Sequence, residues 1–426
     1  MQRHESYKPS GIKWLGDVPS HWDVQALRAV TQLKSDRNRP DLPVLSVYRE
    51  YGVIRKDSRD DNHNATSLDT STYKVVQPGD LVVNKMKAWQ GSMGVSAHEG
   101  IVSPAYITCA TKSERVLPGY LHYLLRSSSL IGVYNSLSYG VRVGQWDMHY
   151  EDFKQIPIPI PPTEEQGRIV TFLDQKTAEI NDAIEKKERL IDLLNEQKSA
   201  LVKQAVTRGL NLNAPTRESG VDWIGDIPAH WQVSSLSHQA VIFAGGTPDR
   251  SAPRYWGGEI PWIKTGEVNF NRISSAEEHI TDSGLKNSAA KIAPAGTLLM
   301  AMYGQGVTRG RVAILDVPAA FNQACVAMKF GRNISTEFAF FYFYGAYSFL
   351  RDSGNESSQM NLSSGAISKF KITIPPMHEQ DEICKHLRDA LEIVNAAEQA
   401  QRQTVDKLHA MKQSLITDAV TGKIKA

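Results

Sequence analysis

The sequence predicts an α+β protein with a pseudo-twofold internal repeat: two small α/β domains separated by two long helices that pair as an antiparallel coiled coil. Three observations support this prediction. A short motif near the N-terminus returns 209 residues later, a long helical segment returns 214 residues later, and the blocks between them contain short β-runs. A repeat at a fixed period indicates that one structural unit occurs twice.

The short motif is SGIKWLGDVPSHWDV from Ser10, which returns as SGVDWIGDIPAHWQV from Ser219. Three of the six substitutions between the copies exchange one apolar residue for another. The aromatic residues that recur are Trp14, Trp22, Trp223 and Trp231, together with His21 and His230. We expect the tryptophans to dock each globular domain on the helix ends, and a contact with a partner protein is the alternative.

The long segment begins as IPIPPTEEQGRIVTFL at Ile158 and as ITIPPMHEQDEICKHL at Ile372. Each copy is predicted to form a helix of about 45 residues, or roughly 65–70 Å at 1.5 Å per residue. The proline pair before each copy blocks an earlier start, and acidic residues fill the first turn, where the helix dipole favours them. Thr163 and Gln166 have the spacing of a capping box for the first helix.

Both helices carry an apolar seam with a seven-residue spacing, which is typical of a coiled coil. The seam residues are Leu173, Ile180, Leu194 and Leu201 in the first copy, and Leu387, Val394, Leu408 and Leu415 in the second. The middle layer is polar in both copies, at Lys187 and Gln401. A polar layer can fix the register, and simple exposure of these side chains is the alternative. By symmetry, we expect the N-terminal motif to lie near the end of the second helix.

The two globular blocks resemble each other only faintly, although each contains a Pro/Gly turn, apolar strands and a Gly-rich hairpin. Residues 24–161 hold 16 Lys and Arg against 13 Asp and Glu, and residues 233–374 hold 13 against 10. This excess is compatible with a nucleic-acid partner without requiring one, because ordinary surfaces vary as much. We place the domain boundaries so that globular blocks 1–160 and 210–374 alternate with helices 161–209 and 375–426.

Composition excludes several protein classes. With 41% hydrophobic and 22% charged residues, the chain has the composition of a globular protein. No apolar run is long enough for a transmembrane helix, and the first residues lack a signal-peptide core, which predicts a cytoplasmic protein without a membrane partner. Cys109, Cys325 and Cys384 are widely spaced and form no metal-ligand or disulfide pattern.

The sequence contains no recognisable catalytic or metal-binding motif. GQGVTRGRV lacks the GK[ST] ending of a phosphate-binding loop, and there is no nucleophile elbow, HExxH segment or Cys/His cluster. The Asx-Pro-Pro-aromatic motif of DNA amino-methyltransferases is absent, since the proline pairs follow Ile160 and Ile374. We interpret His21 and His230 as structural. The sequence therefore predicts a chain that is not an enzyme and has neither catalytic nor metal-binding residues.

The repeated motif, the IPxPPxxEQxxI start and AVT ending of each long helix, and GGTPDR…YWGGEIPWIKTGEV resemble the specificity subunit of Type I restriction-modification enzymes. The resemblance covers essentially the whole chain in the family's own order. It implies that the blocks are target recognition domains. Each would read one half of a bipartite target in double-stranded DNA, with the helices setting the gap between the halves.

The resemblance also implies partners. Two modification (methyltransferase) subunits dock on the helices, and restriction (translocase and nuclease) subunits join the full complex. S-adenosylmethionine, ATP and Mg²⁺ are expected on those partner subunits, and no cofactor is expected in this chain.

Base readout requires Arg, Lys, Asn and Gln on projecting loops. The predicted DNA contacts of the first domain are Lys85, Lys87, Trp89, Gln90, Arg142 and Gln145. Those of the second domain are Tyr303, Gln305, Thr308, Arg309, Gln359 and Asn361, with Arg250 and Lys264 as second-rank candidates. The alternative for each is an ordinary surface residue or, for Trp89 and Tyr303, a partly buried core residue.

Two other functions are considered for the duplicated scaffold. A self-sufficient repressor would need a compact helix-turn-helix and a dimer, of which the sequence gives no sign. A coiled-coil adaptor would bind proteins through its globular domains, independently of DNA. A combined methyltransferase-endonuclease is excluded by the missing catalytic motifs.

Overall fold

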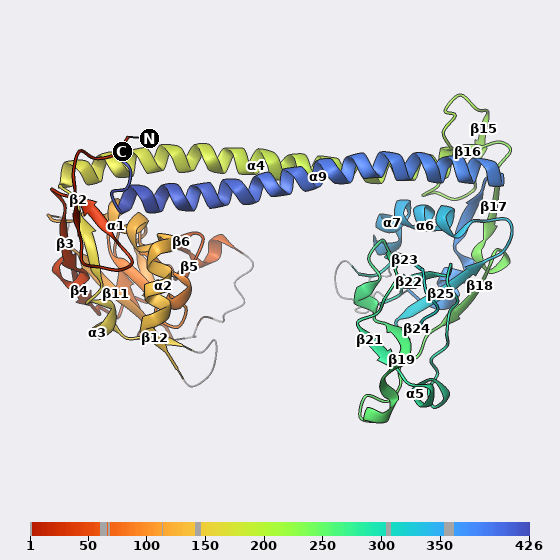
Figure 1. The fold of residues 1–426 in the computed structure, drawn as a ribbon, viewed down its shortest axis with the longest axis horizontal. Coiled ribbons are helices and arrows are strands. Elements are labelled where there is room, and N and C mark those ends of the chain that lie inside the picture. The colour runs from red at the N-terminus through yellow and green to blue at the C-terminus, as the bar shows by residue number, and fades with distance from the viewer. Residues whose placement is uncertain are drawn as a thin grey trace. The chain divides into compact units, whose positions relative to one another are not determined.

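The computed structural model describes residues 2–59, 66, 69–112, 114–140, 146–303, 308–352 and 362–426 (Figure 1). The chain divides into two compact units, which are Met1–Glu188 with Gln403–Ala426 (unit 1) and Arg189–Arg402 (unit 2). Two long helices, α4 (Thr163–Arg208) and α9 (Met377–Val420), each contribute to both units. None of the described helices combines the length and the apolar character needed to cross a membrane.

Unit 1 is built around a four-stranded antiparallel sheet in the order β4-β11-β8-β9. Its strands are β4 (Thr31–Lys34), β8 (Leu81–Asn84), β9 (Met93–Val95) and β11 (Tyr106–Thr111). The two-stranded pairs are β1 (Tyr7–Pro9) with β2 (Asp17–Pro19), β3 (Asp23–Ala26) with β14 (Pro157–Ile160), β5 (Leu45–Tyr48) with β6 (Gly52–Arg55), β7 (Lys74–Val76) with β10 (Gly100–Val102), and β12 (Ser138–Tyr139) with β13 (Asp147–Met148). The helices are α1 (Pro118–Leu125), α2 (Ser128–Leu137) and α3 (Tyr150–Phe153), with 3-10 turns η1 (Leu27–Ala29), η2 (Lys56–Ser58) and η3 (Ala88–Gln90).

Unit 2 is built around a five-stranded sheet in the order β18-β25-β22-β23-β20. Its strands are β18 (Ala240–Ala244), β20 (Asn271–Ile273), β22 (Leu298–Ala301), β23 (Val312–Leu315) and β25 (Cys325–Phe330). The other strands are β19 (Trp256–Ile263), β21 (Glu278–Ile280) and β24 (Ala320–Phe321) in one sheet, and the pairs β15 (Thr216–Glu218) with β16 (Asp226–Pro228) and β17 (Gln232–Ser235) with β26 (Lys371–Ile374). The helices are α5 (Asp282–Lys286), α6 (Thr336–Gly345), α7 (Tyr347–Asp352) and α8 (Ser364–Lys369), with 3-10 turns η4 (Leu236–His238), η5 (Pro253–Tyr255) and η6 (Thr265–Glu267).

The two globular blocks share a strand order although their sequences have diverged. The order β4-β11-β8-β9 in unit 1 matches β18-β25-β22-β23 in unit 2, where β20 is added in parallel beside β23. In each block the strand that follows the short motif pairs with the last strand of the block, β3 with β14 and β17 with β26, in antiparallel register. The predicted α+β fold with an internal repeat is therefore confirmed.

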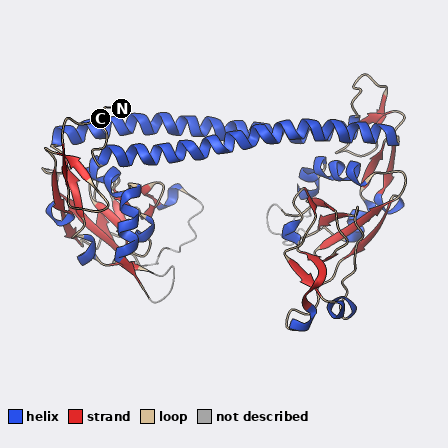
Figure 2. Ribbon diagram, viewed as in Figure 1, coloured by secondary structure: helices blue, strands red, loops and turns tan. Residues whose placement is uncertain are grey.

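The two long helices pack together along an antiparallel seam (Figure 2). In unit 1 the buried cluster contains Ile169, Leu173, Ile180 and Ile184 of α4 with Leu415, Ile416 and Ala419 of α9. In unit 2 it contains Val202, Ala205 and Val206 of α4 with Ile383, Cys384 and Leu387 of α9. The predicted pairing is confirmed, because apolar residues at helical spacing bury one face of each helix.

The seam also includes polar groups. In unit 2, Lys198 Nζ lies 3.0 Å from Glu398 Oε2, with side chains 11% and 16% exposed. Lys187 and Gln401, the predicted polar layer, are both half-buried, so neither is simply exposed. A buried ion pair contributes little net stability, but breaking it leaves an uncompensated charge, so it penalises misaligned helices.

Candidate nucleic-acid interface

In unit 1, the first turn of α4 holds the short motif through one carboxylate. Trp22 Nε1 donates a hydrogen bond to Glu165 Oε1 at 3.1 Å, and His21 Nε2 lies 2.8 Å from Glu165 Oε2. Trp22 is fully buried and Glu165 is 8% exposed. Because Trp22 belongs to the repeated motif and Glu165 to the start of the long helix, these bonds fasten one to the other. We call this contact the first junction.

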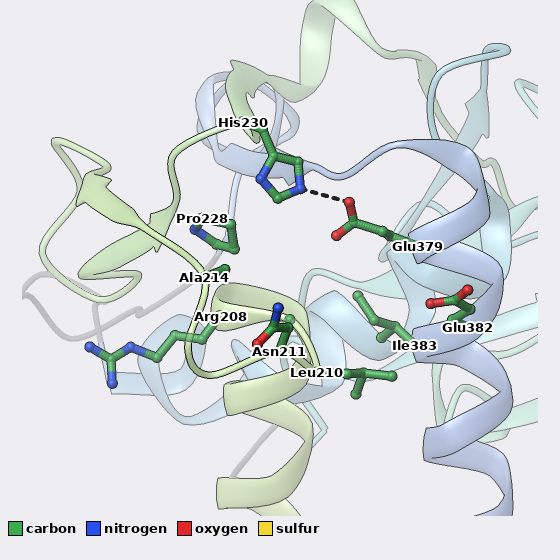
Figure 3. A pocket seen from close by; sticks show the side chains of 10 residues that line it. Arg208, Leu210, Asn211, Ala214, Pro228, His230, Glu379, Glu382 and Ile383 are labelled. Carbon is green, nitrogen blue, oxygen red and sulfur yellow. Dashed lines mark hydrogen bonds and ion pairs between the residues drawn. The ribbon is translucent and has the colours of Figure 1, made fainter.

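Unit 2 repeats the arrangement at the start of α9, the second junction (Figure 3). Trp231 Nε1 donates to Glu379 Oε2 at 2.9 Å, and His230 Nε2 lies 2.6 Å from Glu379 Oε1. Trp231 is 1% exposed. The docking role predicted for Trp22 and Trp231 is confirmed. Trp223 likewise packs in the core of unit 2, and Trp14 packs against that of unit 1.

Each long helix ends against the tryptophan of a junction. Gly422 follows α9 and Gly209 follows α4, with φ of +74° and +73°, a conformation that favours glycine. A Cβ atom at either position would lie 3.1 Å from the ring of Trp22 or Trp231, respectively. Tyr7 Oη donates to the Gly422 carbonyl at 3.1 Å. The N-terminal motif therefore lies at the end of the second helix, as predicted.

Gln166 does not cap the first helix, so the capping-box prediction is wrong. Helix α4 already includes Thr163, and the Gln166 side chain is fully buried. Its Oε1 accepts from Leu117 N at 2.7 Å, while Nε2 donates to the carbonyls of Arg115 at 3.1 Å and Pro161 at 2.8 Å. Buried backbone groups of the globular block need hydrogen-bond partners. The Gln166 side chain bonds to these groups and not to the N-terminal backbone of its own helix.

Gln380 makes the same contacts in unit 2. Its Oε1 accepts from Ser335 N at 2.9 Å, and Nε2 donates to the carbonyls of Asn333 and Pro375 at 2.8 Å each. The Glu-Gln pair at the start of each long helix thus has two tasks. The glutamate holds the short motif, and the glutamine holds the globular block.

The described DNA-contact candidates of unit 1, Lys85, Lys87, Trp89 and Gln90, lie in the segment that follows β8 and includes η3. Lys85 Nζ pairs with Asp147 Oδ2 at 2.7 Å, and the rings of Trp89 and Trp146 lie edge to face at 5.3 Å. Lys87 is exposed, whereas Trp89 and Gln90 are half-buried. Two further candidates, Arg142 and Gln145, lie outside the described residues.

In unit 2, the described candidates lie after β22 and before β23. Tyr303 is 37% exposed, Thr308 is half-buried, and Arg309 is only 6% exposed. Leu362 N donates to the Met302 carbonyl at 3.1 Å, which places the residue after the SSQMN segment beside the start of the Tyr303 loop. The remaining candidates Gln305, Gln359 and Asn361 lie outside the described residues.

The second-rank candidates Arg250 and Lys264 face two glutamates. Arg250 pairs with Glu278, and Lys264 Nζ lies 2.6 Å from Glu277 Oε2 and 3.3 Å from Glu278 Oε1. The Arg250 guanidinium also lies 3.8 Å from the ring centre of Trp256. The hydrogen bond from Arg250 lowers the pKa of Glu278. These cations are therefore already neutralised in the chain, which makes them weaker phosphate ligands than Lys87.

The three cysteines are inert. Burial raises the pKa of Cys109, Cys325 and Cys384 to about 12 each. A thiol with such a pKa is protonated at neutral pH and is a poor nucleophile.

Sequence reasoning missed Glu165 and Glu379 as the partners of the histidines and tryptophans. The available signal was the Glu-Gln pair itself, which occurs at the same place in both helix starts. The helix dipole favours acidic residues in a first turn without any specific partner, so the charge pattern alone does not identify these two contacts.

Comparison with known proteins gives a consistent result. The family model described as Type I restriction modification DNA specificity domain matches residues 19–192 and 228–407. The putative type I restriction enzyme MjaX specificity subunit of Methanocaldococcus jannaschii is 21% identical over 446 aligned positions, which cover 99% of this chain and 97% of that protein. The EcoR124I/EcoR124II specificity subunit of Escherichia coli is 24% identical over 255 positions, or 57% of each chain.

Two solved structures share the fold. A chain from work on complex assembly and conformational transition of the type I R-M system has a TM-score of 0.71 at 17% identity, covering 96% of this chain and 99% of that one. The HsdS subunit from Thermoanaerobacter tengcongensis has a TM-score of 0.53 at 17% identity, covering 98% and 100%.

Proposed function

Because the chain belongs to the Type I restriction-modification DNA specificity family, we propose that its two blocks each recognise one half of a bipartite, gapped target in double-stranded DNA. The chain is a DNA specificity subunit, the non-catalytic component of such an enzyme. The observation that supports two readers is the pair of junctions, Trp22–Glu165 and Trp231–Glu379. They hold two cores of one strand order that carry different loops.

The long helices set the gap between the two halves of the target. Helix α4 has 46 residues and α9 has 44, which correspond to about 69 Å and 66 Å at 1.5 Å per residue. One turn of B-DNA spans about 34–36 Å. A frame of this length therefore allows each block to address its own segment of the major groove.

The helices also provide seats for two modification subunits, which supply S-adenosylmethionine-dependent methylation of adenine. Restriction subunits, with ATP and Mg²⁺, complete the complex in the cytoplasm. The chain supports this role through its duplicated junctions, because two equivalent partners require two equivalent surfaces.

Base and phosphate contacts come from the loops around Lys85, Lys87, Trp89 and Gln90 in unit 1 and around Tyr303 and Thr308 in unit 2, together with the candidates Arg142, Gln145, Gln305, Gln359 and Asn361. Lys87 is best suited to a phosphate because it is exposed. Arg309, which is buried, would have to reorient to reach DNA, and Arg250 and Lys264 would have to leave their glutamates.

The test is to co-express the chain with its modification subunit and to map methylated adenine in the host DNA by single-molecule sequencing. The proposal predicts a gapped motif with two specified parts. A contiguous motif would contradict the two-reader arrangement. An assembled, cofactor-binding complex without any methylation would favour a protein-binding adaptor or a defective subunit.

A further inference from the structure

We propose that His4, His21 and Glu165 form a binding site for one divalent transition-metal ion, Zn²⁺ by preference, at the first junction. His21 Nε2 lies 2.8 Å from Glu165 Oε2, and His4 Nε2 lies 3.8 Å from Glu165 Oε1. The three ligand atoms all lie within 4.8 Å of one another. Among the described residues, these three side chains form the one group of three or more His, Cys, Asp or Glu residues close enough together to hold a metal ion.

His4 supplies the independent evidence for a ligand. Its side chain is 6% exposed, and Nε2 has no hydrogen-bond partner among the described residues. A histidine nitrogen that is buried without a hydrogen-bond partner can offer its lone pair to a metal ion, and imidazole is the commonest metal ligand among side chains. A buried nitrogen without a partner is costly, and a metal ion would satisfy it.

The other ligands fit the same ion. Two imidazoles and one carboxylate are a donor set that Zn²⁺ accepts, with bonds of about 2.0–2.2 Å. Trp22 Nε1 donates to Glu165 Oε1 at 3.1 Å and so orients the carboxylate from behind. The His21 side chain is 50% exposed, so a water molecule can complete the coordination.

The ion would tie three distant parts of the chain together. His4 lies in the N-terminal segment, His21 in the short motif and Glu165 in the first turn of α4. The N-terminal segment also contacts the end of the chain, where Lys425 N donates to the Gln2 carbonyl at 2.9 Å. Metal binding therefore stabilises the closure of unit 1, in which the N-terminus meets the start of one long helix and the end of the other.

The second junction lacks the third ligand and serves as an internal control. At the 209-residue offset, His4 corresponds to Asn213, which is exposed. A cavity of about 220 Å³ lies beside His230 and Glu379 (Figure 3). Among the residues that line it, His230 is the one histidine, so no counterpart of His4 lines this cavity. Two of the three ligands are thus present in both junctions, and only the first has all three.

The test is a titration of the full chain, without a histidine tag, with Zn²⁺ by calorimetry and with Co²⁺ by visible absorption. The wild type should bind one equivalent, with the d–d bands of low-coordinate Co²⁺, and its unfolding temperature should rise with Zn²⁺. His4→Gln should weaken Zn²⁺ binding by about tenfold to 100-fold. His230→Gln, the matched control, should leave affinity and stoichiometry unchanged.

Three results would overturn the site. They are wild-type binding only at millimolar Zn²⁺, equal affinity of wild type and His4→Gln, and an equal loss in His4→Gln and His230→Gln. His4 lies in the N-terminal segment, so His4→Gln should still fold, and circular dichroism of the metal-free variant checks this. Glu165→Gln is the second variant, which keeps an acceptor for Trp22 while removing the carboxylate.

Discussion

The two units are nearly identical at their junctions and different in their candidate DNA-contacting loops. At the junctions, an indole Nε1 donates to a glutamate carboxylate in both units, Trp22 to Glu165 at 3.1 Å and Trp231 to Glu379 at 2.9 Å. At the loops, Lys85 of unit 1 pairs with Asp147 of β13, whereas residues 302–311 of unit 2, between β22 and β23, contain no lysine. Positions that hold the frame are therefore kept in both halves, and positions that could face DNA have diverged.

The largest expected effect tests whether the junctions are equivalent. Trp22→Ala and Trp231→Ala should each lower the free energy of unfolding of their own unit by about 3–5 kcal/mol, because each removes a buried ring and leaves a cavity. Urea unfolding combined with limited proteolysis of each unit measures this. Tyr51→Ala, at a side chain that is 51% exposed, is the control and should cost much less. A large loss in only one tryptophan variant would show that the junctions are not equivalent.

The stability of the two units should depend differently on pH in the acid range. Burial lowers the pKa of His122 in unit 1 to about 4, from about 6.5 in an unfolded chain. Below pH 6.5, His122 binds a proton in the unfolded chain but stays neutral in the folded chain until about pH 4. The free energy of unfolding of unit 1 is therefore highest above pH 6.5 and falls by about 3 kcal/mol by pH 4. Hydrogen exchange of each unit between pH 4 and 7 measures the loss. His122→Gln should flatten the dependence, and an unchanged slope would contradict the assignment.

The glutamine contacts should have equal, intermediate effects. Gln166→Ala and Gln380→Ala each leave buried backbone groups without partners, which costs about 1–3 kcal/mol. The amides of Leu117 and Ser335, respectively, should exchange faster with solvent, as amide hydrogen exchange would show. Gln175→Ala, on the exposed face of α4, is the matched control. Protection that persists at Leu117 in Gln166→Ala would refute the role given to Gln166.

The smallest effect concerns the loops. In the assembled methyltransferase, Lys87→Ala should weaken binding several-fold for every DNA sequence and reduce the slope of log affinity against log salt by about 0.9, because one phosphate contact is lost. Fluorescence anisotropy at several salt concentrations measures both quantities. Lys186→Ala, exposed on α4, should change neither. A change of sequence preference in Lys87→Ala would instead assign Lys87 to a base.

The fold class and the docking role of Trp22 and Trp231 could be predicted because both depend on periodicity and repetition along the chain. The partners of these residues could not, since His21 and Glu165 are 144 positions apart. Gln166 was misassigned because a capping box is a local pattern, whereas its partners Leu117 and Arg115 lie 49 and 51 positions away.

The three residues of the proposed metal site show the same limit. His4 carries no motif, and its position beside His21 and Glu165 depends on how the N-terminal segment packs in unit 1. The DNA-contacting residues stay predictions, because contacts with bases depend on loop geometry in the complex and several candidates lie outside the described residues.

The most direct test of the central claim is an exchange of one block on the intact frame. Residues 236–370, between the closing strands of unit 2, are replaced by the corresponding segment of a relative, and methylated adenine is mapped after co-expression with the modification subunit. We expect one half of the target to change while the other half and the gap stay the same. A change in both halves, or in the gap, would contradict separate readers held on a common frame.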